Sequence, residues 1–142
     1  FVSVKDIDKR AAVGVAQRLA HLGYEIWATG GTHTVLKRSG VPANLVHKIG
    51  DGLRPNVLDK VKNRELQFII NTPSGRGART DEGRIRAAAV GLNIPVITTM
   101  SGADAATRAL EALHRTEFSV VPIQDYLKFR TAPPLPAAAV RT

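Results

Sequence analysis

The chain has 142 residues, carries 20 Lys and Arg against 12 Asp and Glu, and contains no cysteine. This length suits one domain with its own core, and the absence of thiols excludes disulfides and thiolate metal sites. The net charge of +8 favours anionic partners, but with only 5% aromatic residues we expect no nucleic-acid partner, because base stacking needs exposed rings.

The sequence has no apolar run long enough to cross a membrane and no basic start followed by an apolar segment. We therefore expect no membrane partner and a cytoplasmic location, with which the lack of cysteine agrees. Because the first residue is Phe1 rather than methionine, we also expect either a segment of a longer polypeptide or a chain given without its leader.

Strand and helix signals alternate from the first residue onward. A short strand is expected at 1–4, and either Asp6 or Asp8 suits the cap of the helix that follows. The apolar stripe of this helix has the spacing i, i+3, i+4, i+7 and consists of Ala12, Val15, Ala16 and Leu19. Gly23 stands where a helix commonly ends.

The same alternation continues to the end of the chain. Further strands are expected at 24–29, 44–47, 67–71 and 95–99, with a weaker edge strand at 118–121. Helices are expected at 32–39, after an N1 proline at Pro55, after a cap at Asp81, and along Ala106, Ala109, Leu110 and Leu113. This order predicts an α/β domain over 1–130, a three-layer, doubly wound and mostly parallel five-stranded sheet. The Pro/Ala-rich tail, 131–142, is expected to be disordered.

In a sheet of this kind, ligands bind beyond the carboxyl ends of the strands. The strongest candidate there is the turn Thr29-Gly30-Gly31-Thr32. Its glycines let the backbone approach a ligand, and the amides of the next helix suit a phosphate. The alternative is a tight turn in which Thr29 or Thr32 only caps the helix. The turn matches neither the P-loop nor the G-x-G-x-x-G pattern.

Other polar residues follow the remaining strands. Lys9 and Lys48 add cations. Asn71 either offers a donor and an acceptor to a base edge or a ribose or hydrogen-bonds the backbone of the loop that follows it. Asp81 either accepts ribose hydroxyls or caps its helix, and the cap is favoured. The four histidines show no metal-ligand spacing and there is no G-x-S-x-G elbow. We therefore expect no metal site and no catalytic residues.

The turn at 29–32, with the preceding run LAHLGYEIWAT, resembles the methylglyoxal-synthase-like fold. That superfamily includes methylglyoxal synthase, the IMP cyclohydrolase domain of purine synthesis and the last domain of carbamoyl phosphate synthase. The segments 3–9, 46–55 and 69–75 are similar to the third of these. The resemblance covers about residues 1–125.

This resemblance implies the carboxyl-terminal allosteric domain of a carbamoyl phosphate synthase large subunit, with no catalysis of its own. The parent enzyme is an ATP-dependent ligase of arginine and pyrimidine biosynthesis that uses glutamine and bicarbonate. Bacterial members bind UMP or IMP at one site and ornithine at another. The implied partners are the synthetase domains of the same large subunit and a glutaminase small subunit. ATP and Mg would serve the parent enzyme, with no cofactor in this domain.

Residue roles carry over by position. The resemblance implies that Lys9, Thr29, Gly30, Gly31 and Thr32 hold the effector phosphate, with Lys48 beside them, that Asn71 and Asp81 contact ribose or base, and that Thr98 faces ornithine. Pro73 replaces a threonine of some bacterial members, which removes one base contact. The alternative function is a phosphate lyase of the methylglyoxal synthase type. The segment 71–79 stands in place of that enzyme's catalytic aspartate loop, which argues against the alternative.

Overall fold

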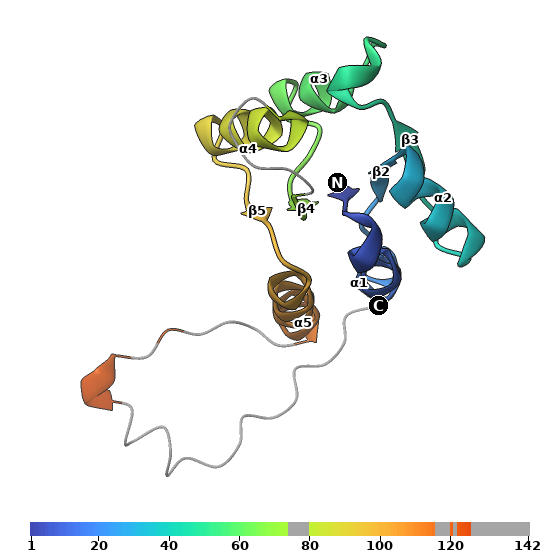
Figure 1. Ribbon diagram of the computed structural model, residues 1–142. Coiled ribbons are helices and arrows are strands. Elements are labelled where there is room, and N and C mark those ends of the chain that lie inside the picture. Colours follow the sequence, from blue (N-terminus) through green and yellow to red (C-terminus); the bar gives the residue numbers. More distant parts are fainter. Residues whose placement is uncertain (74–79, 116–119, 121, 126–142) are drawn as a thin grey trace.

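The computed structural model describes residues 1–73, 80–115, 120 and 122–125. Within them, helices lie on both faces of a central sheet (Figure 1). The tail at 131–142 and most of the edge strand expected at 118–121 lie outside the described residues. No helix in the described part of the chain is long and apolar enough to cross a membrane.

The sheet has five strands, and every neighbouring pair is parallel, as the sequence predicts. The strands are β1 (Val2–Ser3), β2 (Trp27–Thr29), β3 (Asn44–Val46), β4 (Ile69–Asn71) and β5 (Val96–Ile97). They lie in the order β3-β2-β1-β4-β5, and Val2 is in register with both Ala28 and Ile70. The chain therefore winds outward in two directions, and the order reverses between β1 and β4, where such sheets bind ligands.

The helices form two layers. They are α1 (Lys9–His21), α2 (Gly30–Arg38), α3 (Val57–Lys62), α4 (Asp81–Gly91) and α5 (Met100–Arg115), with short 3-10 turns η1 (Asp6–Asp8), η2 (Ile49–Asp51) and η3 (Ile123–Asp125). Helices α1, α2 and α5 cover one face, and α3 and α4 cover the other (Figure 1). Both faces of the sheet are thus shielded from water, as parallel sheets require.

Each helical layer encloses its own core. The whole predicted stripe of α1, from Ala12 to Leu19, is buried in the first cluster. Ile70 belongs to that cluster and Ile69 to the second, and neither is exposed. Because consecutive side chains of a strand point to opposite faces, β4 anchors both layers at once.

Three predicted helix starts are wrong, the first being that of α2, which begins at Gly30 rather than at residue 32. Helix α3 begins at Val57 rather than at Pro55, because the Asn56 side chain accepts from the backbone N–H groups of Leu58 and Asp59 and so caps it. Helix α4 is capped by the Thr80 hydroxyl, which accepts from the Gly83 N–H at 3.2 Å. Asp81 is the first residue of α4, and its carboxylate is available for a contact elsewhere.

The expected inward face of α5 is also partly wrong. Ala103 and Thr107 are its buried residues, and Leu113 is 54% exposed. The helix begins at Met100 and packs against α1, with Ala103 and Leu110 in or against the first core cluster. The Thr107 hydroxyl donates to the Ala103 carbonyl at 2.8 Å, so a polar side chain can be buried there without an unpaired group.

Candidate functional site

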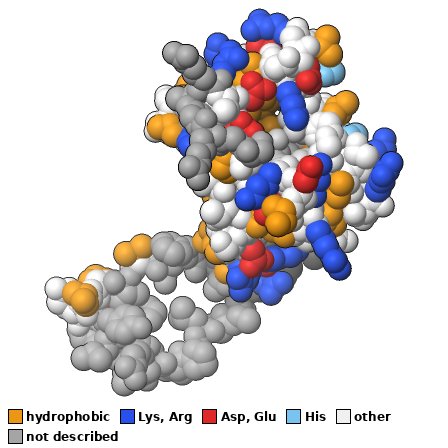
Figure 2. Space-filling view, in the orientation of Figure 1, with side chains coloured by type: hydrophobic (Ala, Val, Ile, Leu, Met, Phe, Trp, Pro, Cys, Tyr) orange, Lys and Arg blue, Asp and Glu red, His pale blue; other side chains and the backbone are white. Residues whose placement is uncertain are grey.

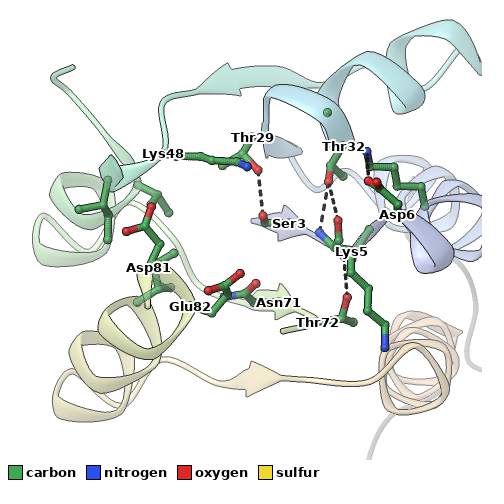
Figure 3. A pocket seen from close by; sticks show the side chains of 16 residues that line it. Ser3, Lys5, Asp6, Thr29, Thr32, Lys48, Asn71, Thr72, Asp81 and Glu82 are labelled. Atoms are coloured by element: carbon green, nitrogen blue, oxygen red, sulfur yellow. Dashed lines mark hydrogen bonds and ion pairs between the residues drawn. The ribbon is translucent and has the colours of Figure 1, made fainter. Parts of the chain in front are cut away.

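A cleft of about 480 Å³ lies at the carboxyl ends of β1, β2 and β4 (Figure 3). Ser3 and Thr29 end two of these strands, and Asn71 ends the third. The segments that follow the strands complete the wall. The cleft therefore occupies the place that the reversal of strand order predicts, and its volume suits a small organic ligand.

The start of α2 forms one wall of the cleft. Thr29 takes the N-cap position with an extended backbone, but its hydroxyl caps no helical N–H. That hydroxyl lies 2.8 Å from Ser3 Oγ instead. The first amides of α2, beginning at Gly30, are left without a side-chain cap at the edge of the cleft. Such amides, with the positive end of the helix dipole behind them, favour an anion.

Two buried threonines bind the backbone of the segment that follows β1. The Thr32 hydroxyl accepts a hydrogen bond from the Val4 N–H at 3.2 Å, and the Thr72 hydroxyl accepts one from the Lys5 N–H at 3.0 Å. Both side chains are 3% exposed. These contacts tie α2 and the residue after β4 to the segment after β1.

Two lysines supply positive charge. Lys9 opens α1, and its ammonium lies 2.6 Å from an Asp6 carboxylate oxygen. It also rests against Gly31, since a Cβ at that glycine would lie 2.7 Å from Lys9 Nζ. Lys48 belongs to the same cleft, and its side chain reaches toward Thr29 (Figure 3). Both cations thus stand beside the start of α2.

The opposite wall is acidic. Asp81 accepts a hydrogen bond from the Gly50 N–H at 2.9 Å, which joins the start of α4 to η2. Glu82 and Asn71 lie on the same side of the cleft (Figure 3), and Asn71 is 2% exposed. The cleft is therefore polarised, with cations and helix amides on one side and hydrogen-bond acceptors on the other. This suits an anion that carries a hydroxyl-rich group.

One acidic group also stands at the cationic wall. A hydrogen bond from Lys9 and the attraction of Lys9 and Lys48 hold the pKa of the Asp6 carboxyl below its ordinary value. Elsewhere, acidic side chains are interspersed among the basic ones on the visible face (Figure 2), as expected for a solvated surface.

Most of the residues singled out in the sequence meet in this cleft. They are Lys9, Thr29, Gly31, Thr32, Lys48, Asn71 and Asp81. Gly30 belongs to the same turn of α2 but does not form part of the wall. Thr98 follows β5, which is separated from β1 by β4, and also lies outside the wall.

Several wall residues were not predicted individually. Ser3, Lys5, Thr72 and Glu82 line the cleft but were assigned no role from the sequence, and Asp6 was considered only as a helix cap. Their common signal is position, because most of them directly follow the carboxyl ends of β1 and β4. Among the described residues, no group of three His, Asp or Glu side chains is placed to hold a metal ion.

A family model described as the MGS-like domain matches residues 11–98. The carbamoyl phosphate synthase large chain, C-terminal section, of Methanocaldococcus jannaschii is 46% identical over 125 residues, which are 88% of this chain and 20% of the relative. The carbamoyl phosphate synthase large chain of Nostoc sp. is 44% identical over 89% of this chain and 11% of its own length. That of Myxococcus xanthus is 42% identical over 94% of this chain and 12% of its own length. The chain thus spans between a tenth and a fifth of these relatives.

Proposed function

Because the chain belongs to the MGS-like domain family, we propose that it is the effector-binding regulatory module of a carbamoyl phosphate synthase large chain. The observation that carries the proposal is the anion-binding wall of the cleft. Uncapped amides of α2 and the cations Lys9 and Lys48 converge there. Such a wall matches the phosphate of a nucleoside monophosphate.

Each wall would contact a different part of the nucleotide. The phosphate of UMP or IMP lies against the turn 29–32, with Lys9 and Lys48 beside it. Asn71 and Asp81 contact ribose or base from the opposite side, where their oxygens accept from hydroxyls. Ornithine would bind elsewhere, near Thr98, because this residue lies outside the cleft.

Regulation would follow from differential affinity. A nucleotide that binds one conformation of the synthase better than another shifts the population toward that conformation. The partners are then the synthetase domains of the same large chain and a glutaminase small subunit. ATP and Mg serve those parts of the enzyme, and this module adds binding free energy rather than chemistry.

The test is a thermal-shift and calorimetric panel of UMP, IMP, ornithine and inorganic phosphate. A ligand that binds only the folded chain stabilises it by about 2.7 kcal/mol when its free concentration is about a hundred times its Kd. UMP or IMP at such a concentration should therefore raise Tm. We expect Lys9→Ala and Lys48→Ala each to weaken nucleotide binding about tenfold, the loss of one charge-assisted contact.

The matched control is Lys37→Ala. Lys37 is exposed in the last turn of α2, outside the cleft wall, and its removal lowers the net charge equally. The affinity of the Lys37→Ala variant for the nucleotide should stay at the wild-type value. Equal weakening by all three variants would mean that only net charge matters, and a panel without any binding would overturn the proposed function.

A phosphate lyase remains the second candidate, because Asp6 and Asp81 place carboxylates in the same phosphate-binding cleft. A lyase of the methylglyoxal synthase type removes phosphate from dihydroxyacetone phosphate with an aspartate base. Both candidates bind phosphate, so only turnover separates them. We expect no methylglyoxal from this chain with that substrate, and its formation would favour the lyase.

A further inference from the structure

We propose that Asp6 is an internal counter-ion of the anion site, and that an anionic ligand binds by taking the Lys9 ammonium over from it. This inference rests on the proposed function, since it concerns the affinity of the same site. In this role Asp6 lowers the affinity of the site for an anion, whereas the neighbouring lysines raise it.

The geometry makes Asp6 a replaceable partner. Its carboxylate belongs to η1 and meets Lys9 at 2.6 Å across a spacing of i, i+3. The side chain of Asp6 is 94% exposed, whereas that of Lys9 is 23% exposed. Ion pairs with a solvent-exposed partner stabilise proteins little. Asp6 can therefore leave for water at small cost, while the lysine stays at the edge of the cleft.

Lys9 needs no movement to meet a ligand. Its ammonium already rests against Gly31 in the first turn of α2, where the absence of a Cβ leaves room for it. An ammonium has three N–H donors, and an Asp6 carboxylate oxygen lies 2.6 Å from that of Lys9. A phosphate and the Asp6 carboxylate carry charges of the same sign, so they compete for this cation.

The simplest structural role for Asp6 is different. A carboxylate before the first turn of α1 interacts favourably with the helix dipole, and its loss would then lower the stability of the fold without changing anion affinity. A substitution of Asp8 distinguishes the counter-ion role from the helix-dipole role. Asp8 stands in the same 3-10 turn, its nearest cation is Lys5 at 3.8 Å, and it lies outside the cleft wall.

The experiment measures the binding of inorganic phosphate and of UMP by calorimetry to wild type, Asp6→Asn, Asp8→Asn, Lys9→Ala and the double variant Asp6→Asn with Lys9→Ala. Asp6→Asn should bind both ligands roughly two- to fivefold more tightly, the range expected for an exposed ion pair. Asp8→Asn makes the same change in net charge and should show a smaller gain. In the Lys9→Ala background, the gain from Asp6→Asn should fall to that of Asp8→Asn.

The outcomes separate this inference from the proposed function. If wild type binds and Lys9→Ala weakens binding, but Asp6→Asn gains no more than Asp8→Asn, the counter-ion role is overturned while the proposed function stands. An undiminished gain in the double variant would show repulsion that does not act through Lys9, and would also overturn it. If wild type binds neither ligand, both proposals fail. Tm values identify any variant that is misfolded, and Asp6→Ser then replaces Asp6→Asn.

Discussion

The segment after β1 shows how single residues shape the cleft. Thr32 and Thr72 are buried, and their hydroxyls accept from two consecutive backbone N–H groups. A variant that removes the Thr32 hydroxyl would leave the Val4 N–H without this acceptor, which costs about 1–3 kcal/mol in a buried place. Such a variant would lose stability and affinity together. Residues whose side chains are free of structural contacts are better probes of the site.

Gly30 and Gly31 provide a pair of such probes, because a glycine has no side chain that could hold the fold together. They are neighbours in the first turn of α2, but a Cβ at Gly31 would lie 2.7 Å from Lys9 Nζ, whereas a Cβ at Gly30 meets nothing within 4 Å. We expect Gly31→Ala to weaken phosphate binding several-fold, because the flexible end of Lys9 must move away, and to leave stability nearly unchanged. Calorimetry and urea unfolding measure the two effects.

Gly30→Ala is the matched control and should weaken phosphate binding less, because Gly30 lies outside the cleft wall and its Cβ would meet nothing within 4 Å. Alanine favours a helix over glycine by up to about 1 kcal/mol, so neither variant should lose helix stability. Equal weakening by both substitutions would show that the backbone of the turn, rather than the position of Lys9, limits affinity.

At the scale of elements, α1 and α5 are joined by a cluster of charges. Arg18 of α1 binds Glu111 through two hydrogen bonds of 2.8 Å and Asp104 through one of 2.6 Å. Asp104 also pairs with Arg108 one turn further along α5. Hydrogen bonds from Arg18 are the main reason that the pKa values of both carboxyls lie below their ordinary values of 3.8 and 4.5.

This cluster predicts a pH dependence of stability. Because both carboxyls have a lower pKa in the folded chain than in the unfolded chain, their contribution is complete above about pH 4.5 and declines as the pH falls through the folded values. We expect Arg18→Gln to lower Tm by a few degrees near neutral pH, and the difference from wild type to shrink below about pH 4. Thermal unfolding as a function of pH measures it.

The control for this prediction is Arg10→Gln, since Arg10 is an exposed residue of the same helix. Its Tm should follow that of the wild type across the whole range. An Arg18→Gln deficit that persisted undiminished at acidic pH would assign the effect to packing of the arginine stem rather than to the two carboxylates.

At the scale of the whole molecule, the cleft joins parts of the chain that are far apart in sequence. The hydrogen bond from the Gly50 N–H to Asp81 spans 31 residues and links η2 to α4. Because β1 lies at the centre of the sheet, the wall with Lys9 and Lys48 and the acidic wall face each other across the carboxyl ends of the strands. The two walls should therefore contribute separately to ligand binding.

Asp81→Ala tests this division. We expect it to weaken the binding of UMP or IMP about tenfold, because a contact to ribose or base and the link to η2 are lost. Inorganic phosphate should lose no affinity, because it lies against the other wall, and this makes it the internal control of the same calorimetric titration. Equal losses for phosphate and nucleotide would contradict the division, since the whole cleft would then depend on the Asp81–Gly50 contact.

Local patterns determined much of the fold. The spacing of Ala12, Val15, Ala16 and Leu19 predicted the buried face of α1, and the alternation of strands and helices predicted a parallel sheet with two helical layers. The periodicity of side chains is set by backbone geometry within one element, so a sequence can show it directly. Helix starts were predicted less well, because Asn56 and Thr80 competed with other plausible caps nearby.

The sequence by itself determined which strand ends carry hydroxyls, amides and cations, and so it indicated an anion site near Lys9, Thr29 and Thr32. Only the tertiary structure decided which of these strand ends meet. The order β3-β2-β1-β4-β5 brings Asn71 and Asp81 to the same cleft and leaves Thr98 outside its wall, and it reveals Asp6 as the partner of Lys9. The physical reason is that strand order and side-chain pairing depend on packing between distant segments, which no local pattern encodes.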